Sequence, residues 1–217
     1  MAAVVPLSDA SRPTRFPVVT VLIVAANAVC FALELAGGEA FAVRWSVIPA
    51  QIVGGHHLLS LFTAMYMHGS WSHIIGNMLF LWAFGPAVED VMRPIGYFIF
   101  YTLGGVAGML CQIAVSPDST VPCLGASAAI AAVMGAFLVT YPADRIKSLL
   151  ILGWFVRVTF IPAAVLIGVW FLIQLVNAGA IVSDQQKGGV AYVAHIGGGI
   201  FGAVFARFFE APRRRFQ

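Results

Sequence analysis

Four polar side chains with the chemistry of acyl transfer stand within apolar stretches of the sequence: Ser127, His195, His73 and Asn77. A serine hydroxyl becomes a nucleophile when a base removes its proton, and a neutral imidazole can do so at about pH 7. The attack creates an oxyanion that needs hydrogen-bond donors, which His73, Asn77 and the Ser127 backbone N–H can supply. No Asp or Glu is expected at the same depth, so these residues predict a Ser127–His195 dyad rather than a triad.

The composition around these residues is that of a membrane protein. The chain has 217 residues, of which 60% are hydrophobic and 10% charged, and its mean hydropathy is +0.93. Ordinary soluble domains are about 45–50% apolar and about 25% charged. A spanning helix takes about 20 residues, so the length accommodates roughly six helices in one bundle and no second domain. The net charge of +3 comes mostly from tails and short loops, which indicates orientation in the bilayer rather than nucleic-acid binding.

The apolar stretches predict an all-α integral membrane protein with six spanning helices, of which the fourth is short and recessed. We expect a cytoplasmic N-terminal tail at 1–16 and a basic C-terminal tail at 210–217. Between the tails, helices are expected at about 17–36, 68–90, 95–115, 127–141, 160–178 and 190–209, with a long first loop at 37–67.

The basic residues predict how the helices are oriented. Of the 12 Lys and Arg residues, all but Arg44 and Lys187 fall on the side of the two termini in this arrangement. Since positive charge marks the cytoplasmic side, both termini are expected there. The second, fourth and sixth helices then start from the extracytoplasmic side, to which the active site would open.

The short fourth helix sets the depth of Ser127. A helix over 127–141 spans roughly 22 Å at about 1.5 Å per residue, whereas the hydrocarbon core is about 30 Å thick. The loop before the helix must therefore dip into the membrane, which irregular backbone does only inside protein or beside water. We expect Ser127 at the floor of a water-accessible cavity, with His195 and His73 about 7 Å and Asn77 about 14 Å down.

Glycines would allow the two catalytic helices to approach. Gly198 and Gly202 follow His195 by three and seven residues and form a small-residue face. Such faces let backbones come close together in lipid. We therefore assign a helix-packing role to Gly198, Gly202 and Gly125, and we expect this packing to bring His195 to Ser127.

Several short motifs occur in the order, and on the helices, of a known family. They are Gly-x-Ser at the start of the fourth helix, Ala-His-x-x-Gly-x-x-x-Gly from Ala194 to Gly202, His-x-x-x-x-His-x-x-x-Asn from His68 to Asn77, and Gly-Asn-Met-Leu-Phe-Leu-Trp from Gly76 to Trp82. Together they resemble the rhomboid intramembrane serine proteases of bacterial type, over about residues 17–209.

The resemblance implies an activity and a set of partners. Ser127 is implied as the nucleophile, His195 as the general base, and His73 with Asn77 as the oxyanion-stabilising pair. The substrates would be transmembrane segments of other proteins, cut near the extracytoplasmic side, with no cofactor, metal or nucleic acid involved. The fifth helix, which contains Trp170, would be a mobile substrate gate, and the protein would act in the bacterial inner membrane.

Two other functions stay open. A rhomboid-like protein could bind transmembrane clients without cutting them. Ala128 stands where the family usually has glycine, and Ala131 stands where an aromatic commonly packs on the catalytic histidine. More remotely, a metal transporter or metalloenzyme could use the histidines, but the sequence has no HExxH motif and no carboxylate at their level.

Three further predictions concern residues outside the dyad. His68 is expected to be structural, as a hydrogen-bond partner for the first loop, and Glu89 is expected to hold loop backbone rather than act as an acid. The three cysteines, Cys30, Cys111 and Cys123, lack metal-binding spacing and are expected to be buried, inert thiols. A disulfide between Cys111 and Cys123 stays open.

Overall fold

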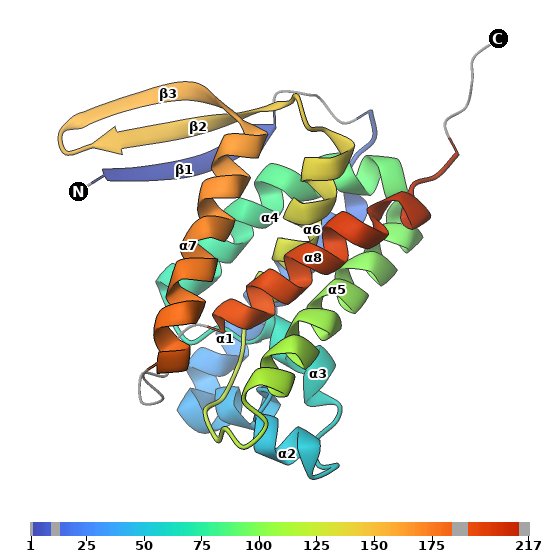
Figure 1. Cartoon of the computed structure of the whole chain (residues 1–217), viewed down its shortest axis with the longest axis vertical. Helices are drawn as coiled ribbons and strands as arrows, with labels where there is room; N and C mark the ends of the chain where they lie inside the picture. The colour runs from blue at the N-terminus through green and yellow to red at the C-terminus, as the bar shows by residue number, and fades with distance from the viewer. Residues whose placement is uncertain (1, 10–13, 184–190, 213–217) are drawn as a thin grey trace.

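The computed structural model describes all of the chain except residues 1, 10–13, 184–190 and 213–217. It is mostly helical, and six apolar helices form one bundle (Figure 1). They are α1 (Val18–Trp45), α4 (Trp71–Met92), α5 (Pro94–Val115), α6 (Ser127–Thr140), α7 (Ala163–Ser183) and α8 (Tyr192–Phe209). Within the described residues, α1, α4, α5 and α8 are long and apolar enough to cross a membrane, and α6 and α7 are shorter apolar helices. This is the helical membrane bundle that the sequence predicts.

Helix α6 lies at the centre of the bundle. All of its residues from Ala128 to Phe137 are buried, and it packs against α8, α5 and α4. A helix that is apolar on every side is stable only when it is surrounded, which explains this central position. Its 14 residues extend over roughly 21 Å, less than the thickness of a hydrocarbon core of about 30 Å.

Two glycines of α8 lie directly against the backbone of α6. A side chain at Gly198 would collide with the carbonyl of Ala128, and one at Gly202 would collide with the carbonyl of Ala132. The two backbones therefore touch with nothing between them, as small-residue faces permit. This contact fixes how His195 lies relative to the first turn of α6.

The first helix is longer than predicted. It does not end at residue 36 but kinks at Gly38, which has a φ of 67° and a ψ of −169°, and continues to Trp45. A single left-handed glycine interrupts the helix without ending it, because the residues that follow resume helical geometry. The first loop is correspondingly shorter and contains three short helical segments: α2 (Pro49–Val53), α3 (Ser60–Thr63) and η1 (Ala64–Tyr66).

A three-stranded sheet, which was not expected, is added to the bundle. Strand β1 (Ala2–Asp9) pairs antiparallel with β2 (Arg145–Leu152), which pairs antiparallel with β3 (Phe155–Pro162). Residues 2–9 are thus a strand rather than part of a tail, and the connection between α6 and α7 is a β-hairpin. The sheet projects sideways at the end of the bundle where α7 begins and α8 ends (Figure 1).

Carboxylates at this end of α4 hold the start of α1. Glu89 accepts hydrogen bonds of 2.8 Å each from the backbone N–H groups of Val19 and Thr20 and from the Thr20 hydroxyl. The next residue, Asp90, accepts from the backbone N–H of Thr14 at 3.0 Å. The first N–H groups of a helix have no partner within it, so Glu89 satisfies two of them and opposes the positive end of the helix dipole, while Asp90 holds the chain just before the helix. Glu89 therefore anchors backbone, but that of a helix start rather than a loop.

Candidate active site

Ser127 is the first residue of α6 and is partly exposed. The loop that leads to it is tied to the first loop of the chain. The Gly125 N–H donates to the Ala64 carbonyl at 2.9 Å, and Cys123 and Val47 exchange backbone hydrogen bonds of 2.9 and 2.7 Å. These bonds satisfy backbone that runs inside the protein and set where the serine sits.

The structure brings Ser127 and His195 together. His195 Nε2 lies 2.7 Å from Ser127 Oγ, and the imidazole is 6% exposed. His195 stands in the first turn of α8, which the close contact with α6 fixes in place. A hydroxyl and an imidazole in this geometry can exchange a proton directly.

A third residue, Gln174 of α7, completes a hydrogen-bonded row. Its Oε1 lies 2.7 Å from His195 Nδ1, and its Nε2 donates to the Trp170 carbonyl at 3.3 Å. An amide oxygen only accepts, so the hydrogen of the neutral imidazole is on Nδ1 and Nε2 is left to accept from Ser127. Gln174 is absent from the predicted set, although a buried amide in an apolar helix is itself a signal of function.

Helix α7 also supplies an aromatic ring to the histidine. The Trp170 ring lies 5.4 Å from the His195 ring, centroid to centroid, with the planes inclined by 38°. Ala131, at the position where the family commonly has an aromatic residue, is fully buried in α6. The aromatic ring that packs on the imidazole thus comes from α7 and not from α6.

His73 and Asn77, both on α4, lie beside the loop that precedes the serine. A Cβ on Gly125 would stand 2.7 Å from His73 Nε2 and 3.6 Å from Asn77 Nδ2. Gly125 also has a φ of +121°, which disfavours any other residue. Rather than packing two helices together, Gly125 leaves room for the two polar side chains of α4 next to Ser127.

His68 connects Asn77 to helix α1. Its Nε2 lies 2.9 Å from Asn77 Nδ2, and its backbone N–H donates to both oxygens of Glu34, at 2.7 and 3.0 Å. The amide nitrogen of Asn77 can only donate, so His68 accepts and one Asn77 N–H stays available for another acceptor. His68 is therefore structural in a specific sense, since it fixes the direction of the Asn77 amide.

The cysteines lie outside the hydrogen-bonded row Ser127–His195–Gln174. All three are free thiols, and none is fully buried as expected, since Cys111 is exposed and Cys30 and Cys123 are half-buried. Burial raises the pKa of the loop residue Cys123 to about 11, so this thiol stays protonated at neutral pH and is a poor nucleophile. Among the described residues, no group of three or more His, Cys, Asp or Glu side chains is arranged to hold a metal ion.

The family follows from a comparison with known sequences. The model of the Rhomboid domain matches residues 55–211, which is most of the chain and includes every residue of the site. The chain is a member of the rhomboid family. It is therefore an intramembrane protease or a rhomboid-like protein built on the same domain.

Curated rhomboids from a plant, a yeast and a bacterium are similar to this one. Rhomboid-like protein 11, chloroplastic, of Arabidopsis thaliana is 31% identical over 150 residues, which cover 65% of this chain and 49% of that protein. Rhomboid protein 1, mitochondrial, of Saccharomyces cerevisiae is 26% identical over 152 residues, 68% of this chain and 40% of the relative. Rhomboid protease GluP of Bacillus subtilis is 28% identical over 179 residues, 81% of this chain and 31% of the relative. The matched stretch of this rhomboid thus spans a third to a half of its relatives' length.

Proposed function

We propose that this rhomboid is an intramembrane serine endopeptidase that cleaves transmembrane segments of other membrane proteins by a Ser127–His195 dyad. The observation that carries the proposal is the 2.7 Å separation of Ser127 Oγ and His195 Nε2, with Gln174 on the opposite nitrogen of the imidazole. The Bacillus subtilis relative is named a rhomboid protease, which supports the same activity.

In the acylation step, His195 Nε2 takes the Ser127 proton while Oγ attacks the carbonyl carbon of the scissile peptide bond. The π electrons of the carbonyl move to its oxygen and form the oxyanion. The free N–H of Asn77, the His73 ring and the Ser127 backbone N–H donate to that oxygen. When the intermediate collapses, the C–N bond breaks and the protonated His195 gives its proton to the leaving amine.

Deacylation repeats the sequence with water. His195 removes a proton from a water molecule whose oxygen attacks the acyl carbon, and the bond to Oγ breaks as Ser127 recovers the proton. Gln174 keeps the imidazole in one tautomer throughout, and its neutral amide leaves the positive charge on His195 unpaired in the intermediate. The row Ser127–His195–Gln174 thus works as a dyad with an oriented base.

We infer that both termini lie in the cytoplasm and that the protein resides in the bacterial inner membrane, with the site open to the extracytoplasmic side. The distribution of basic residues supports this orientation. Arg15, Arg93, Arg145, Lys147, Arg157 and Arg207 belong to segments at the end of the bundle where α7 begins and α8 ends, and Arg44 belongs to the opposite end of α1.

Cleavage of a single-span model substrate in reconstituted vesicles tests the proposal. We expect Ser127→Ala and His195→Ala each to abolish cleavage, while Ser72→Ala, which removes an exposed hydroxyl on α4, leaves it unchanged. Cleavage by the Ser127→Ala protein would refute the mechanism. If the unsubstituted protein binds the substrate without cutting it, the chain is instead a client-binding rhomboid-like protein.

A further inference from the structure

The outer half of the sheet carries apolar side chains on both faces. Val156 and Val158 share one face and are 57% and 47% exposed, and Phe160, which continues that face toward the bundle, is 53% exposed. Phe155 and, through the register, Val4 lie on the other face and are 48% and 44% exposed. An antiparallel sheet with one face in water carries polar residues on that face. Apart from Arg157, which shares the face of Phe155, the strand residues of this half are apolar, so neither face resembles an ordinary water-exposed face.

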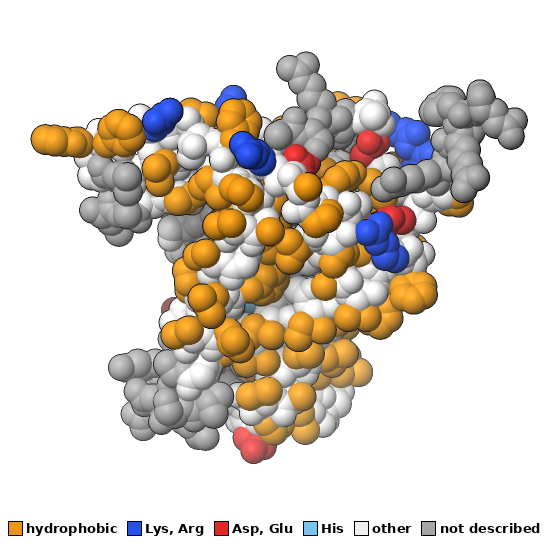
Figure 2. All heavy atoms as spheres, turned by 45° about the horizontal axis from the view of Figure 1, so that its top comes forward, with side chains coloured by type: hydrophobic (Ala, Val, Ile, Leu, Met, Phe, Trp, Pro, Cys, Tyr) orange, Lys and Arg blue, Asp and Glu red, His pale blue; other side chains and the backbone are white. Residues whose placement is uncertain are grey.

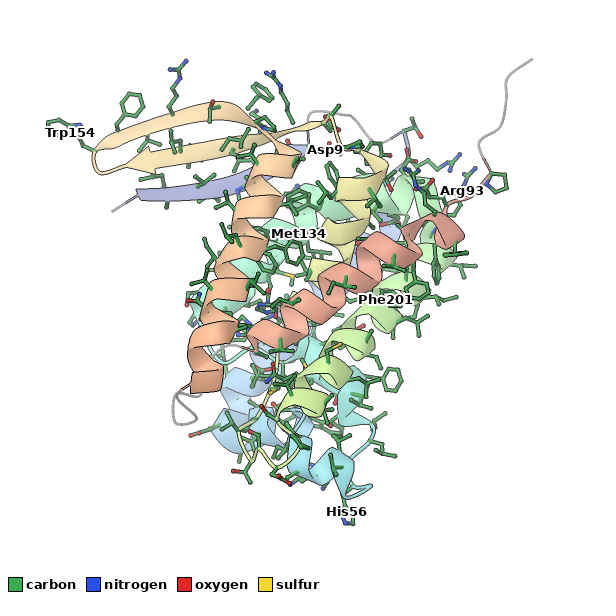
Figure 3. The ribbon with its side chains drawn as sticks, viewed as in Figure 1. Asp9, His56, Arg93, Met134, Trp154 and Phe201 are labelled. Atoms are coloured by element: carbon green, nitrogen blue, oxygen red, sulfur yellow. The ribbon has the colours of Figure 1, made fainter. Side chains whose placement is uncertain are left out.

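The inner half of the same sheet is part of the protein core. Ile146 and Ser148 of β2 are fully buried, and Ile146 belongs to the main apolar cluster of the bundle. The hairpin is thus held rigidly at one end and projects beyond the helices at the other. Trp154 stands at the projecting tip, 96% exposed, and points away from the molecule (Figure 3).

The exposed apolar surface of the sheet continues that of a membrane helix. Strand β3 ends at Pro162 and α7 begins at the next residue, Ala163. Along α7, Val165, Val169 and Leu172 are 54%, 53% and 58% exposed, as expected for a helix that faces lipid. The hairpin therefore leaves the bundle where this lipid-facing helix begins, a level at which lipid head groups are expected.

The charges on the sheet indicate which type of lipid it would bind. Arg145, Lys147 and Arg157 are all exposed, and the only acidic residue in the three strands is Asp9, at the inner end. Basic side chains gather among exposed apolar ones at this end of the molecule (Figure 2). Tryptophan and basic residues are the groups that anchor proteins at the interface, and a cluster of cations near a membrane attracts anionic lipids.

We propose that the outer half of the sheet is a membrane anchor that inserts into the head-group region beside α7 and binds anionic phospholipid. Phosphate groups pair with Arg157 in the outer half and with Arg145 and Lys147, whose side chains are exposed at the adjoining inner half, while Trp154 and the flanking apolar side chains lie at the boundary with the acyl chains. A second copy of the chain suits this surface less well, because it would bring the same cations together. The inference is independent of the proteolytic activity.

Spin labelling in lipid nanodiscs tests the anchor. In a chain whose three cysteines are replaced by alanine, Trp154→Cys carries a nitroxide, with Val169→Cys as a lipid reference and Asp118→Cys, in an exposed loop, as a water reference. Collisions with oxygen and with a water-soluble nickel complex report depth. We expect position 154 to lie between the two references and to move deeper when phosphatidylglycerol is added to phosphatidylcholine.

Neutralising the cations provides the matched comparison. The triple variant Arg145→Gln, Lys147→Gln and Arg157→Gln should remove the effect of phosphatidylglycerol at position 154. Three results would overturn the proposal: accessibility to nickel equal to that at position 118, no change on adding phosphatidylglycerol, or spin–spin broadening that reveals a second copy. Because Trp154 is almost fully exposed, its replacement does not disturb the packing of the sheet.

Discussion

Gln174 Oε1 accepts a hydrogen bond from His195 Nδ1 at 2.7 Å, and it does so from the helix that begins at the sheet. The same helix places Trp170 on the imidazole ring. The base of the proposed dyad is therefore oriented by α7. Movement of α7 away from α8 would break the hydrogen bond between Gln174 and His195 and release the imidazole.

Replacing Gln174 by methionine keeps the length of the side chain but removes the acceptor. A hydrogen bond contributes about 0.5–1.5 kcal/mol, so we expect kcat to fall by about two- to thirteenfold with KM unchanged. Gln174→Glu, which restores an acceptor oxygen, should recover most of the rate. Steady-state cleavage of a model substrate gives both constants, with Gln112→Met, in the apolar helix α5, as control. Equal rates for Gln174→Met and the unsubstituted protein would show that Gln174 does not orient the base.

Gly125→Ala tests the space in front of His73 and Asn77. The new Cβ would lie 2.7 Å from His73 Nε2 at a φ of +121°, so the loop or the ring must move. Displacements of this kind cost on the order of 10²-fold in rate. Gly76→Ala, on α4 where nothing lies within 4 Å of the added Cβ, is the matched control and should stay active. An active Gly125→Ala protein would contradict the assigned position of the oxyanion.

Asn77→Ala removes a proposed oxyanion donor and should lower kcat by an amount of order 10²–10³ without changing KM. His68→Phe removes the acceptor that fixes the Asn77 amide, so it should lower kcat by less. Because His68 acts through Asn77, the double variant is expected to be no slower than Asn77→Ala alone. Additive losses in a double-mutant cycle would show that His68 has a role of its own.

Asp9, at the inner end of β1, gives the sheet a dependence on pH. Burial, and secondarily the nearby Asp144, raises the pKa of Asp9 from 3.8 to about 7. The folded form therefore favours the protonated Asp9 carboxyl. Its contribution to the stability of the sheet is complete below pH 3.8 and is lost as the pH rises through about 7. We expect amide protection in β1, corrected for intrinsic exchange, to fall over this range, and Asp9→Asn to remove the dependence. Amide protection in β1 that rises with pH would contradict an upward shift of the Asp9 pKa.

The sequence predicts which side chains meet at the site better than it predicts the elements around them. Ser127 and His195 could be paired because their helices start from the same side, and a fixed rise per residue places them at one depth. Gln174 could not be predicted in the same way, since its contact with His195 depends on how α7 is rotated against α8. That rotation is set by packing. A helix that is apolar on all sides has no hydrophobic periodicity from which its rotation could be predicted.

The sheet is the element that the sequence conceals. Residues 149–152 form a continuous apolar run without the alternation that predicts a strand beside water, and only the short stretch from Val156 to Phe160 alternates. Strand β1 pairs with residues about 145 positions away, a contact that local sequence does not indicate. The continuation of α1 past Gly38 is hidden for a simpler reason: two adjacent glycines ordinarily indicate the end of a helix.

The most direct test of the dyad is covalent labelling of the purified protein with a serine-reactive fluorophosphonate, followed by mass spectrometry of the modified peptide. We expect a single adduct on Ser127, with labelling abolished in Ser127→Ala and strongly slowed in His195→Ala. An adduct on another serine, or labelling that persists in Ser127→Ala, would contradict the assignment of Ser127 as a nucleophile activated by His195.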